Sequence, residues 1–126
     1  MAKMIVETTN APAAVGAYSQ ATSALGFAFC SGQIALDPET GEFVEGSVAE
    51  QTRRCMENLS AVLDAAGTSL IHVVKVTAYL ADMSDFPEFN DAYSEYFASE
   101  PPARATVGVA ALPKGAAVEI ECTAVV

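Results

Sequence analysis

One arginine stands out for its chemistry. Arg104 interrupts the otherwise apolar stretch Pro101–Val107, separated by one alanine from a proline pair. A proline-fixed loop that turns into a strand is a rigid platform, from which a guanidinium can hold a carboxylate through two parallel hydrogen bonds. The same spacing also fits an arginine at the edge of a sheet that pairs with a surface acid. The spacing leaves both interpretations open.

The second candidate is a pair of carboxylates, Glu119 and Glu121, in the segment Val118–Cys122. Alternate residues of a strand share a face, so both carboxylates point to one side and the apolar residues around them to the other. If the acidic face is open to water, both are ordinary solvated residues. If another subunit covers it, one of them becomes a candidate base with a raised pKa.

The numbers and positions of the histidine and cysteine residues exclude most other catalytic sites. His72 is the only histidine and lies beside an apolar segment, which favours a structural role over a triad or a common zinc or iron site. Cys30, Cys55 and Cys122 are far apart, as expected of reduced, buried thiols. No phosphate-binding glycine motif is present in the sequence. An arginine and a carboxylate, with no metal and no histidine, suit a small anionic substrate and attack by water.

Composition narrows the class of protein further. The 126 residues are 52% hydrophobic, and 16 acidic against 6 basic residues give a formal net charge of -10. This predicts one globular domain, residues 1–126, that binds neither nucleic acid nor membrane, because both carry negative charge. The sequence shows no secretory signal and no membrane-spanning run, so we expect a cytoplasmic protein.

Two helices and six strands are predicted to position the candidates. The first helix begins at Ser47, where Ser47 and Glu50 have capping-box spacing, and ends at Gly67. The second spans Pro87–Ala98. The strands are expected at Met4–Thr8, Ala21–Ser23, Phe27–Gln33, His72–Leu80, Arg104–Val109 and Ala117–Val126.

This order, βββ-α-β-α-ββ, predicts an α+β fold: a mixed six-stranded sheet with both helices on one face and parallel neighbours across each helical crossover. The other face has no helix to cover it. In the segment His72–Leu80, Val74, Val76, Ala78 and Leu80 are expected on one side, with Val73, Thr77 and Tyr79 on the other. Since both sides carry apolar residues, the sequence predicts self-association.

Eight groups of residues, in order from about Asn10 to the C-terminus, carry a further signal. They are Gly16–Ala21, Ser31–Ile34, Asp37–Gly41, Gln51-Thr52 with Asn58-Leu59, Val74–Thr77, Asp85-Phe86 with Asn90, Pro102–Arg104, and Leu112–Lys114 with Val118–Glu121. Together they resemble the RidA (YjgF) family of reactive-intermediate deaminases. The resemblance implies a chorismate-mutase-like fold, a homotrimer whose sites lie between subunits, and no cofactor.

The resemblance also implies a reaction, the hydrolysis of 2-imino acids and their enamines (2-aminoacrylate, 2-iminobutanoate and 2-iminopropanoate) to 2-keto acids and ammonia. Arg104 matches the arginine that binds the substrate carboxylate, and Glu119 the glutamate that activates water. The other residues that match substrate-binding positions are Tyr18, Ser31, Gly32 and Asn90. Thr106 stands where many family members have cysteine, and the resemblance implies that this residue contributes its backbone carbonyl.

Two other functions are weighed against the deaminase. The first is a non-enzymatic sensor or partner-binding module on the same trimeric fold, in which Arg104 captures the carboxylate of a keto or amino acid. The second is a ribonuclease or translation inhibitor, which the charge of -10 and the missing basic patch disfavour.

Overall fold

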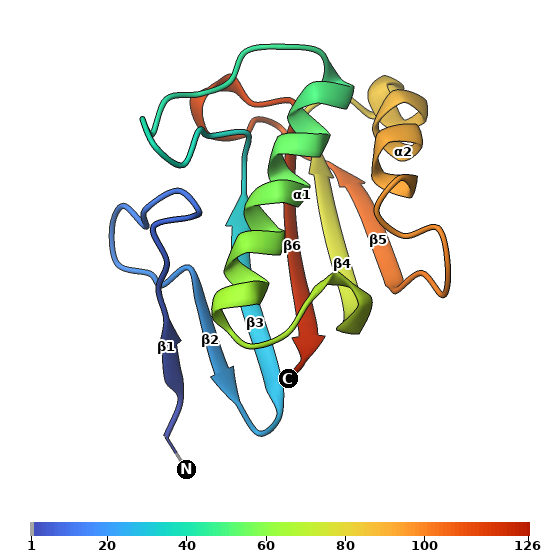
Figure 1. Ribbon diagram of the computed structural model, residues 1–126. Coiled ribbons are helices and arrows are strands. Elements are labelled where there is room, and N and C mark those ends of the chain that lie inside the picture. Colours follow the sequence, from blue (N-terminus) through green and yellow to red (C-terminus); the bar gives the residue numbers. More distant parts are fainter. Residues whose placement is uncertain (1) are drawn as a thin grey trace.

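The computed structural model describes residues 2–126 as one six-stranded sheet with two α-helices (Figure 1). The elements are β1 (Met4–Val6), β2 (Ala21–Ala24), β3 (Phe27–Gln33), α1 (Val48–Ala65), β4 (Val73–Leu80), α2 (Phe86–Ser94), β5 (Ala103–Gly108) and β6 (Val118–Val125). The predicted α+β class and the order βββ-α-β-α-ββ are therefore confirmed. No helix in the described part of the chain combines the length and apolar character needed to cross a bilayer.

The sheet has the strand order β1-β2-β3-β6-β4-β5. β4 and β5 are parallel neighbours, as predicted for strands joined through α2. β3 and β4 also run parallel, but the expectation that they are neighbours is wrong, because β6 pairs antiparallel with both and lies between them. The C-terminal strand, which carries both candidate carboxylates, thus becomes a central strand of the sheet.

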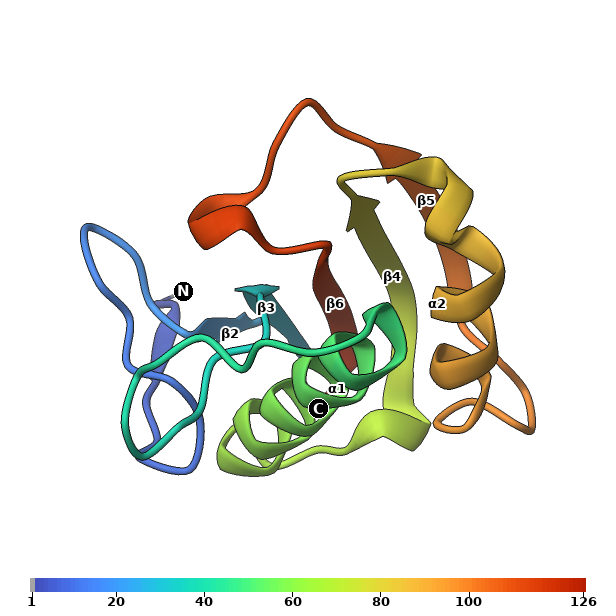
Figure 2. The same ribbon diagram turned by 90° about the horizontal axis from the view of Figure 1, so that it is seen from above.

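Both helices cover the same face of the sheet, as Figure 2 shows from above. α1 begins as predicted: the Ser47 hydroxyl accepts a hydrogen bond from the Glu50 N–H at 3.1 Å, and the Glu50 carboxylate accepts one from the Ser47 N–H. The helix ends before Gly67, whose φ of 84° is left-handed. Its buried stripe packs on β3 and β6 and includes Cys55, Met56, Leu59, Val62 and Leu63.

α2 is shorter than expected, because it ends at Ser94 and not at Ala98. Beyond it, the N–H groups of Glu95, Tyr96 and Phe97 bond to carbonyls three residues back. This tighter pattern ends the α-helix one turn early, although the ring of Phe97 still packs 4.9 Å from that of Tyr93.

The start of β4 differs from the prediction. Residues Leu70–His72 form a 3-10 turn, so His72 is exposed and precedes the strand. A register irregularity between Val73 and Lys75 then places Val73 in the core and leaves Val74 exposed, the reverse of the expected faces. Because a bulge adds one unpaired residue, the alternation of faces changes there, and the predicted pattern holds only from Val76 onward.

The face opposite the helices exposes apolar side chains, as expected. Phe29 of β3 is 48% exposed and packs 6.2 Å from Phe27, and Val107 and Val125 are similarly accessible. On the helix-covered face, by contrast, Val76, Ala78, Ile120 and other side chains are fully buried. An uncovered apolar face of this kind is typical of an interface between subunits.

Candidate active site

Arg104 lies on β5, an edge strand of the sheet, and its side chain is on the helix-covered face. Its register partner on β4 is the buried Val76. The guanidinium carbon lies 4.8 Å from the centre of the Tyr93 ring, 5.5 Å from that of Phe86 and 5.7 Å from that of Phe89. Three aromatic rings of α2 therefore surround the charge, and cation-π attraction stabilises it.

One polar partner orients this guanidinium. Its Nη1 donates a hydrogen bond of 2.8 Å to Oδ1 of Asn90, one helical turn before Tyr93 on α2. Within residues 2–126 no carboxylate forms an ion pair with Arg104, whereas the exposed Arg53 pairs with Glu95 at 2.9 Å. The remaining N–H donors of Arg104 border a cavity of about 370 Å³ between α2 and the Pro101-Pro102 loop. A half-buried cation without a counter-charge is suited to bind an anion in this cavity.

Two further hydroxyls lie beside Arg104. Thr106 follows it by two residues on the same face of β5, and its Oγ1 is buried with no hydrogen-bond partner among the described residues. The same holds for the hydroxyl of Tyr93, whose burial raises its pKa to about 12. Both hydroxyls are therefore neutral and retain unused hydrogen-bonding capacity.

Glu119 occupies the opposite face of the sheet. Its register partner on β4 is Tyr79, and it borders a cavity of about 320 Å³ with Glu121 and the loop residues Ala111–Pro113. Burial, and next the negative charge of Glu121, raise the pKa of Glu119 above its ordinary value. A carboxylate with a raised pKa is a stronger base than an exposed one.

Gly32 is packed against this carboxylate. The register between β3 and β6 shifts between Cys30 and Gln33, so Ser31 and Gly32 lie in an irregular segment between two paired residues. A Cβ atom at position 32 would lie 2.9 Å from Cδ of Glu119 and closer still to its Oε2. A larger residue at position 32 would therefore displace the Glu119 carboxylate, whereas the backbone angles of Gly32 do not themselves demand glycine.

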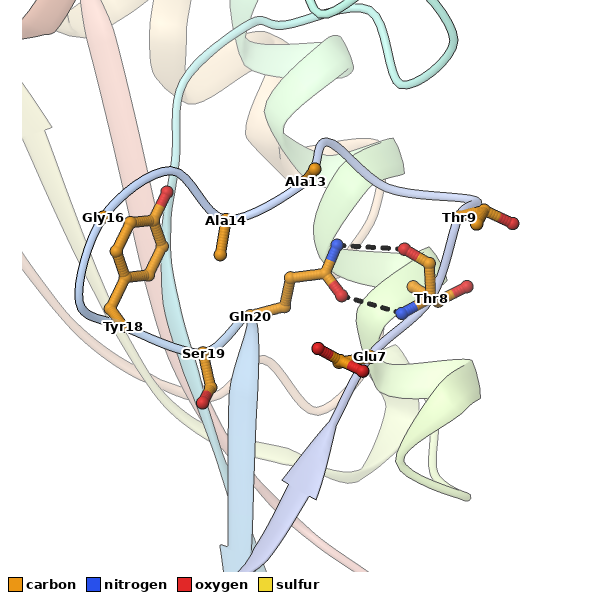
Figure 3. Close-up of a pocket in the computed structure, with 9 residues that line it drawn as sticks. All are labelled: Glu7, Thr8, Thr9, Ala13, Ala14, Gly16, Tyr18, Ser19 and Gln20. Carbon is orange, nitrogen blue, oxygen red and sulfur yellow. Dashed lines mark hydrogen bonds between the residues drawn. The ribbon is translucent and has the colours of Figure 1, made fainter.

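Ser31 links this region to the loop that carries Tyr18. Its hydroxyl donates a hydrogen bond of 2.6 Å to the carbonyl of Ser19, and its N–H donates one of 2.9 Å to the carbonyl of Gln20. Tyr18, which is 52% exposed, is thereby held next to the end of β3. The loop borders a cavity of about 610 Å³, in which Tyr18 and Gln20 are seen together (Figure 3).

The buried side chain of Gln20 was not identified as a site residue from the sequence. Its amide accepts a hydrogen bond from the Thr8 N–H at 2.8 Å and donates one of 3.0 Å to the carbonyl of Thr8 (Figure 3). The same amide also donates a hydrogen bond of 2.8 Å to the carbonyl of Pro12. It thus links the start and the end of the loop that contains Tyr18. The sequence places Gln20 in the Gly16–Ala21 motif, directly before β2, but its position in the motif does not reveal such a role.

The seven predicted site residues therefore separate into two groups within one chain. Tyr18, Ser31, Gly32 and Glu119 form what we call the Glu119 half, and Asn90, Arg104 and Thr106 the Arg104 half. Val76 and Tyr79, the β4 partners of Arg104 and Glu119, are three residues apart, so their side chains point to opposite faces. The sheet itself separates the two halves.

Comparison with known proteins gives consistent matches over nearly the whole chain. Residues 8–126 match the family model described as endoribonuclease L-PSP. A 2-iminobutanoate/2-iminopropanoate deaminase of Bos taurus is 47% identical, over 99% of this chain and 91% of the relative. The structure of an endoribonuclease L-PSP homologue from Entamoeba histolytica superposes with a TM-score of 0.95 at 50% identity, covering 99% of this chain and 100% of the other. The structure of E. coli TdcF with bound serine superposes with a TM-score of 0.92 at 39% identity, covering 97% of this chain and 98% of the other.

Proposed function

Because this chain belongs to the endoribonuclease L-PSP family, also called the YjgF/RidA family, we propose that it is a 2-iminobutanoate/2-iminopropanoate deaminase. The reaction is the hydrolysis of a 2-imino acid to a 2-keto acid and ammonia. Relatives that carry this name are 45% to 47% identical to the chain over almost its full length, which supports the same activity here.

The observation that carries the proposal is the unpaired guanidinium of Arg104. Its aromatic surroundings and its hydrogen bond to Asn90 hold it at the edge of a cavity, with no carboxylate of residues 2–126 to neutralise it. A 2-imino acid supplies that missing carboxylate. Two parallel hydrogen bonds from the guanidinium then fix both the position and the orientation of the substrate.

In this proposal the active site is completed by a second subunit. The Arg104 half lies beside the edge strand β5, and the Glu119 half lies on the face that exposes Phe29 and Val125. Burying this face against the β5 edge of a neighbouring copy brings the two halves together. Three copies arranged in a closed ring then contain three equivalent sites.

The chemistry requires one base and no cofactor. Glu119 takes a proton from water as the water oxygen bonds to the C=N carbon of the protonated imine. The glutamic acid then returns the proton to nitrogen, the C–N bond breaks with its electron pair leaving on ammonia, and loss of the hydroxyl proton gives the keto group. Overall, the iminium form of the acid and water give the 2-keto acid and ammonium. Because the iminium is already electrophilic, positioning and a single base are sufficient.

The other site residues bind and orient the substrate in this scheme. Asn90 holds the Arg104 guanidinium, and Thr106 offers its backbone carbonyl to the nitrogen. Gly32 allows Glu119 to reach the substrate and offers its backbone N–H. Ser31 and Tyr18 close the same pocket from the loop side.

The test is the rate at which an imine disappears. A serine/threonine dehydratase supplies 2-aminoacrylate or 2-aminocrotonate, and semicarbazide captures what remains. We expect wild type and Arg53→Ala to accelerate the loss of imine, and Arg104→Ala to be inactive while keeping the same oligomeric state. Arg53 is a matched control because it is an exposed arginine with an acidic partner. Undiminished turnover by Arg104→Ala would refute its role.

A second function is supported by the same guanidinium. E. coli TdcF is described with bound serine, an amino acid whose carboxylate would suit Arg104. In a sensor or binding module, this chain would capture such a ligand without turnover. Binding of 2-ketobutyrate that requires Arg104, together with no acceleration of imine loss, would favour this alternative.

A further inference from the structure

A hydrogen-bonded pair, Tyr79 and Glu121, accompanies the proposed base on the uncovered face. The Tyr79 hydroxyl on β4 donates a short hydrogen bond to Oε1 of Glu121 on β6. It does so diagonally, because the register partner of Tyr79 is Glu119 and that of Glu121 is Thr77. The tyrosine ring therefore extends from beside Glu119 to the carboxylate of Glu121.

All three side chains border the cavity of about 320 Å³ described above. Glu119 and Glu121 are two residues apart on one strand and share a face, so their charges are close. The Tyr79 hydroxyl holds the Glu121 carboxylate through this hydrogen bond, which is strong because its acceptor is a carboxylate. In agreement, the hydrogen bond to Glu121 raises the pKa of Tyr79 to about 12, which keeps this hydroxyl a donor.

Few other titratable groups lie on the elements around Glu119. Lys75 of β4 is exposed, and its register partner is Thr123, two residues beyond Glu121. Lys114, in the loop before β6, is also exposed. From α1, on the far side of the sheet, comes the buried thiol of Cys55, whose pKa is raised, first by burial. β3 contributes Ser31 and Gly32, and β5 contributes Ala105 and Val107, none of which titrates. Within one copy of the chain, Glu121 is therefore the charge that acts on Glu119 from the same face; in the proposed trimer, Arg104 of the neighbouring copy acts on Glu119 with the opposite sign.

We propose that Tyr79 and Glu121 form a positioning pair that holds a fixed negative charge beside Glu119 and thereby sets its proton affinity. This rests on the proposed function, in which Glu119 is the base. Tyr79 holds the Glu121 carboxylate in one orientation, and the nearby charge makes Glu119 retain a proton more strongly than an exposed glutamate. Neither residue needs to touch the substrate.

The test follows Glu119 directly and so does not depend on turnover. The carboxyl carbons of glutamate are labelled with ¹³C, the Glu119 signal is assigned by its loss in Glu119→Gln, and its titration midpoint is measured. We expect Glu121→Gln to lower that midpoint by roughly half a pH unit or more, given the coupling of exposed charge pairs. Glu57→Gln is the control, because it removes one negative charge from an exposed position on α1.

Tyr79→Phe provides a second variant. Without the hydroxyl, the Glu121 carboxylate is free to turn into solvent, so the Glu119 midpoint should lie between those of wild type and Glu121→Gln. The acid limb of kcat/KM against pH should shift in the same direction in both variants.

An unchanged Glu119 midpoint in Glu121→Gln, or an equal change in Glu57→Gln, would overturn the proposal. A failure of the proposed function alone would give a different combination of results. If the titration shifts as expected but the wild type does not accelerate imine loss, the pair is supported and the deaminase is not.

Discussion

Arg104 and Glu119 lie on opposite faces of the same sheet. Arg104 pairs with the buried Val76 under α2, and Glu119 pairs with Tyr79 on the uncovered face. Each borders its own cavity, of about 370 and 320 Å³ respectively. If the two act on one substrate, they must come from different copies of the chain. A site shared between copies can therefore be tested by measuring the activity of oligomers that mix two inactive variants.

The first prediction is complementation between inactive subunits. Arg104→Ala and Glu119→Gln should each be inactive alone, but mixed oligomers should recover activity, since a site needs Arg104 from one subunit and Glu119 from its neighbour. With random assembly at equal amounts, about one quarter of the sites are intact, so about a quarter of wild-type kcat is expected. The measurement is imine loss after co-expression or joint refolding. No recovery in oligomers shown to be mixed would contradict a shared site.

The second prediction concerns the contact between Gly32 and Glu119. Gly32→Ala should push the Glu119 carboxylate away and lower kcat by roughly 10- to 100-fold, as expected for misplacement of a reacting group. The melting temperature should change little, because Gly32 has ordinary backbone angles. Gly46→Ala is the matched control: a Cβ there would lie 2.8 Å from Oε2 of Glu50, another glutamate, but away from the site. Equal activity in both variants would argue against Glu119 as the base.

The third prediction concerns pH. Burial and Glu121 raise the pKa of Glu119, and the ionised form is the active base, so kcat/KM should fall as pH drops through a value above the ordinary 4.5. The sign follows because protonation removes the base. A pH profile of kcat/KM tests this, with His72→Gln excluding the only histidine as the titrating group. A flat profile down to the ordinary glutamate value would contradict the raised pKa.

The fourth prediction concerns the hydrogen bonds of the Gln20 side chain to Thr8 and Pro12, which we call the Gln20 clamp. Gln20→Leu keeps the side-chain volume but leaves buried backbone groups near Thr8 and Pro12 without partners, so the protein should lose about 2 kcal/mol of unfolding free energy. Because the loop carries Tyr18, KM should rise more than kcat falls. Denaturant unfolding and kinetics are compared with Glu7→Gln, an exposed residue of the same cavity. An unchanged unfolding midpoint would show that water replaces the clamp.

The fifth prediction concerns the uncovered face. Phe29→Lys should weaken subunit association on the order of 100-fold, because it puts a charge at the centre of an apolar patch. Ile71→Lys should leave assembly unchanged, although Ile71 is 84% exposed, because it lies in the 3-10 turn before β4. Sedimentation velocity distinguishes the two. Normal assembly of Phe29→Lys would show that another surface holds the oligomer together.

Local sequence patterns are sufficient to predict the secondary-structure elements and the types of residue that carry the chemistry. The capping box at Ser47, the glycine stop at Gly67 and the alternation around Glu119 are local rules, so the start of α1 and the faces of β6 could be predicted. The motifs around Tyr18, Ser31 and Arg104 were sufficient to indicate the family, which the comparisons confirm.

Which of these residues come into contact depends on long-range packing. The insertion of β6 between β3 and β4 depends on pairing between strands far apart in the chain, and the bulge at Val73–Lys75 depends on register, neither of which a local pattern encodes. The cation-π contacts of Arg104 with α2, the Gln20 clamp and the Tyr79–Glu121 pair arise from the same long-range packing. For this reason the sequence identified Arg104 and Glu119 together, while the fold separates them on two faces of one sheet.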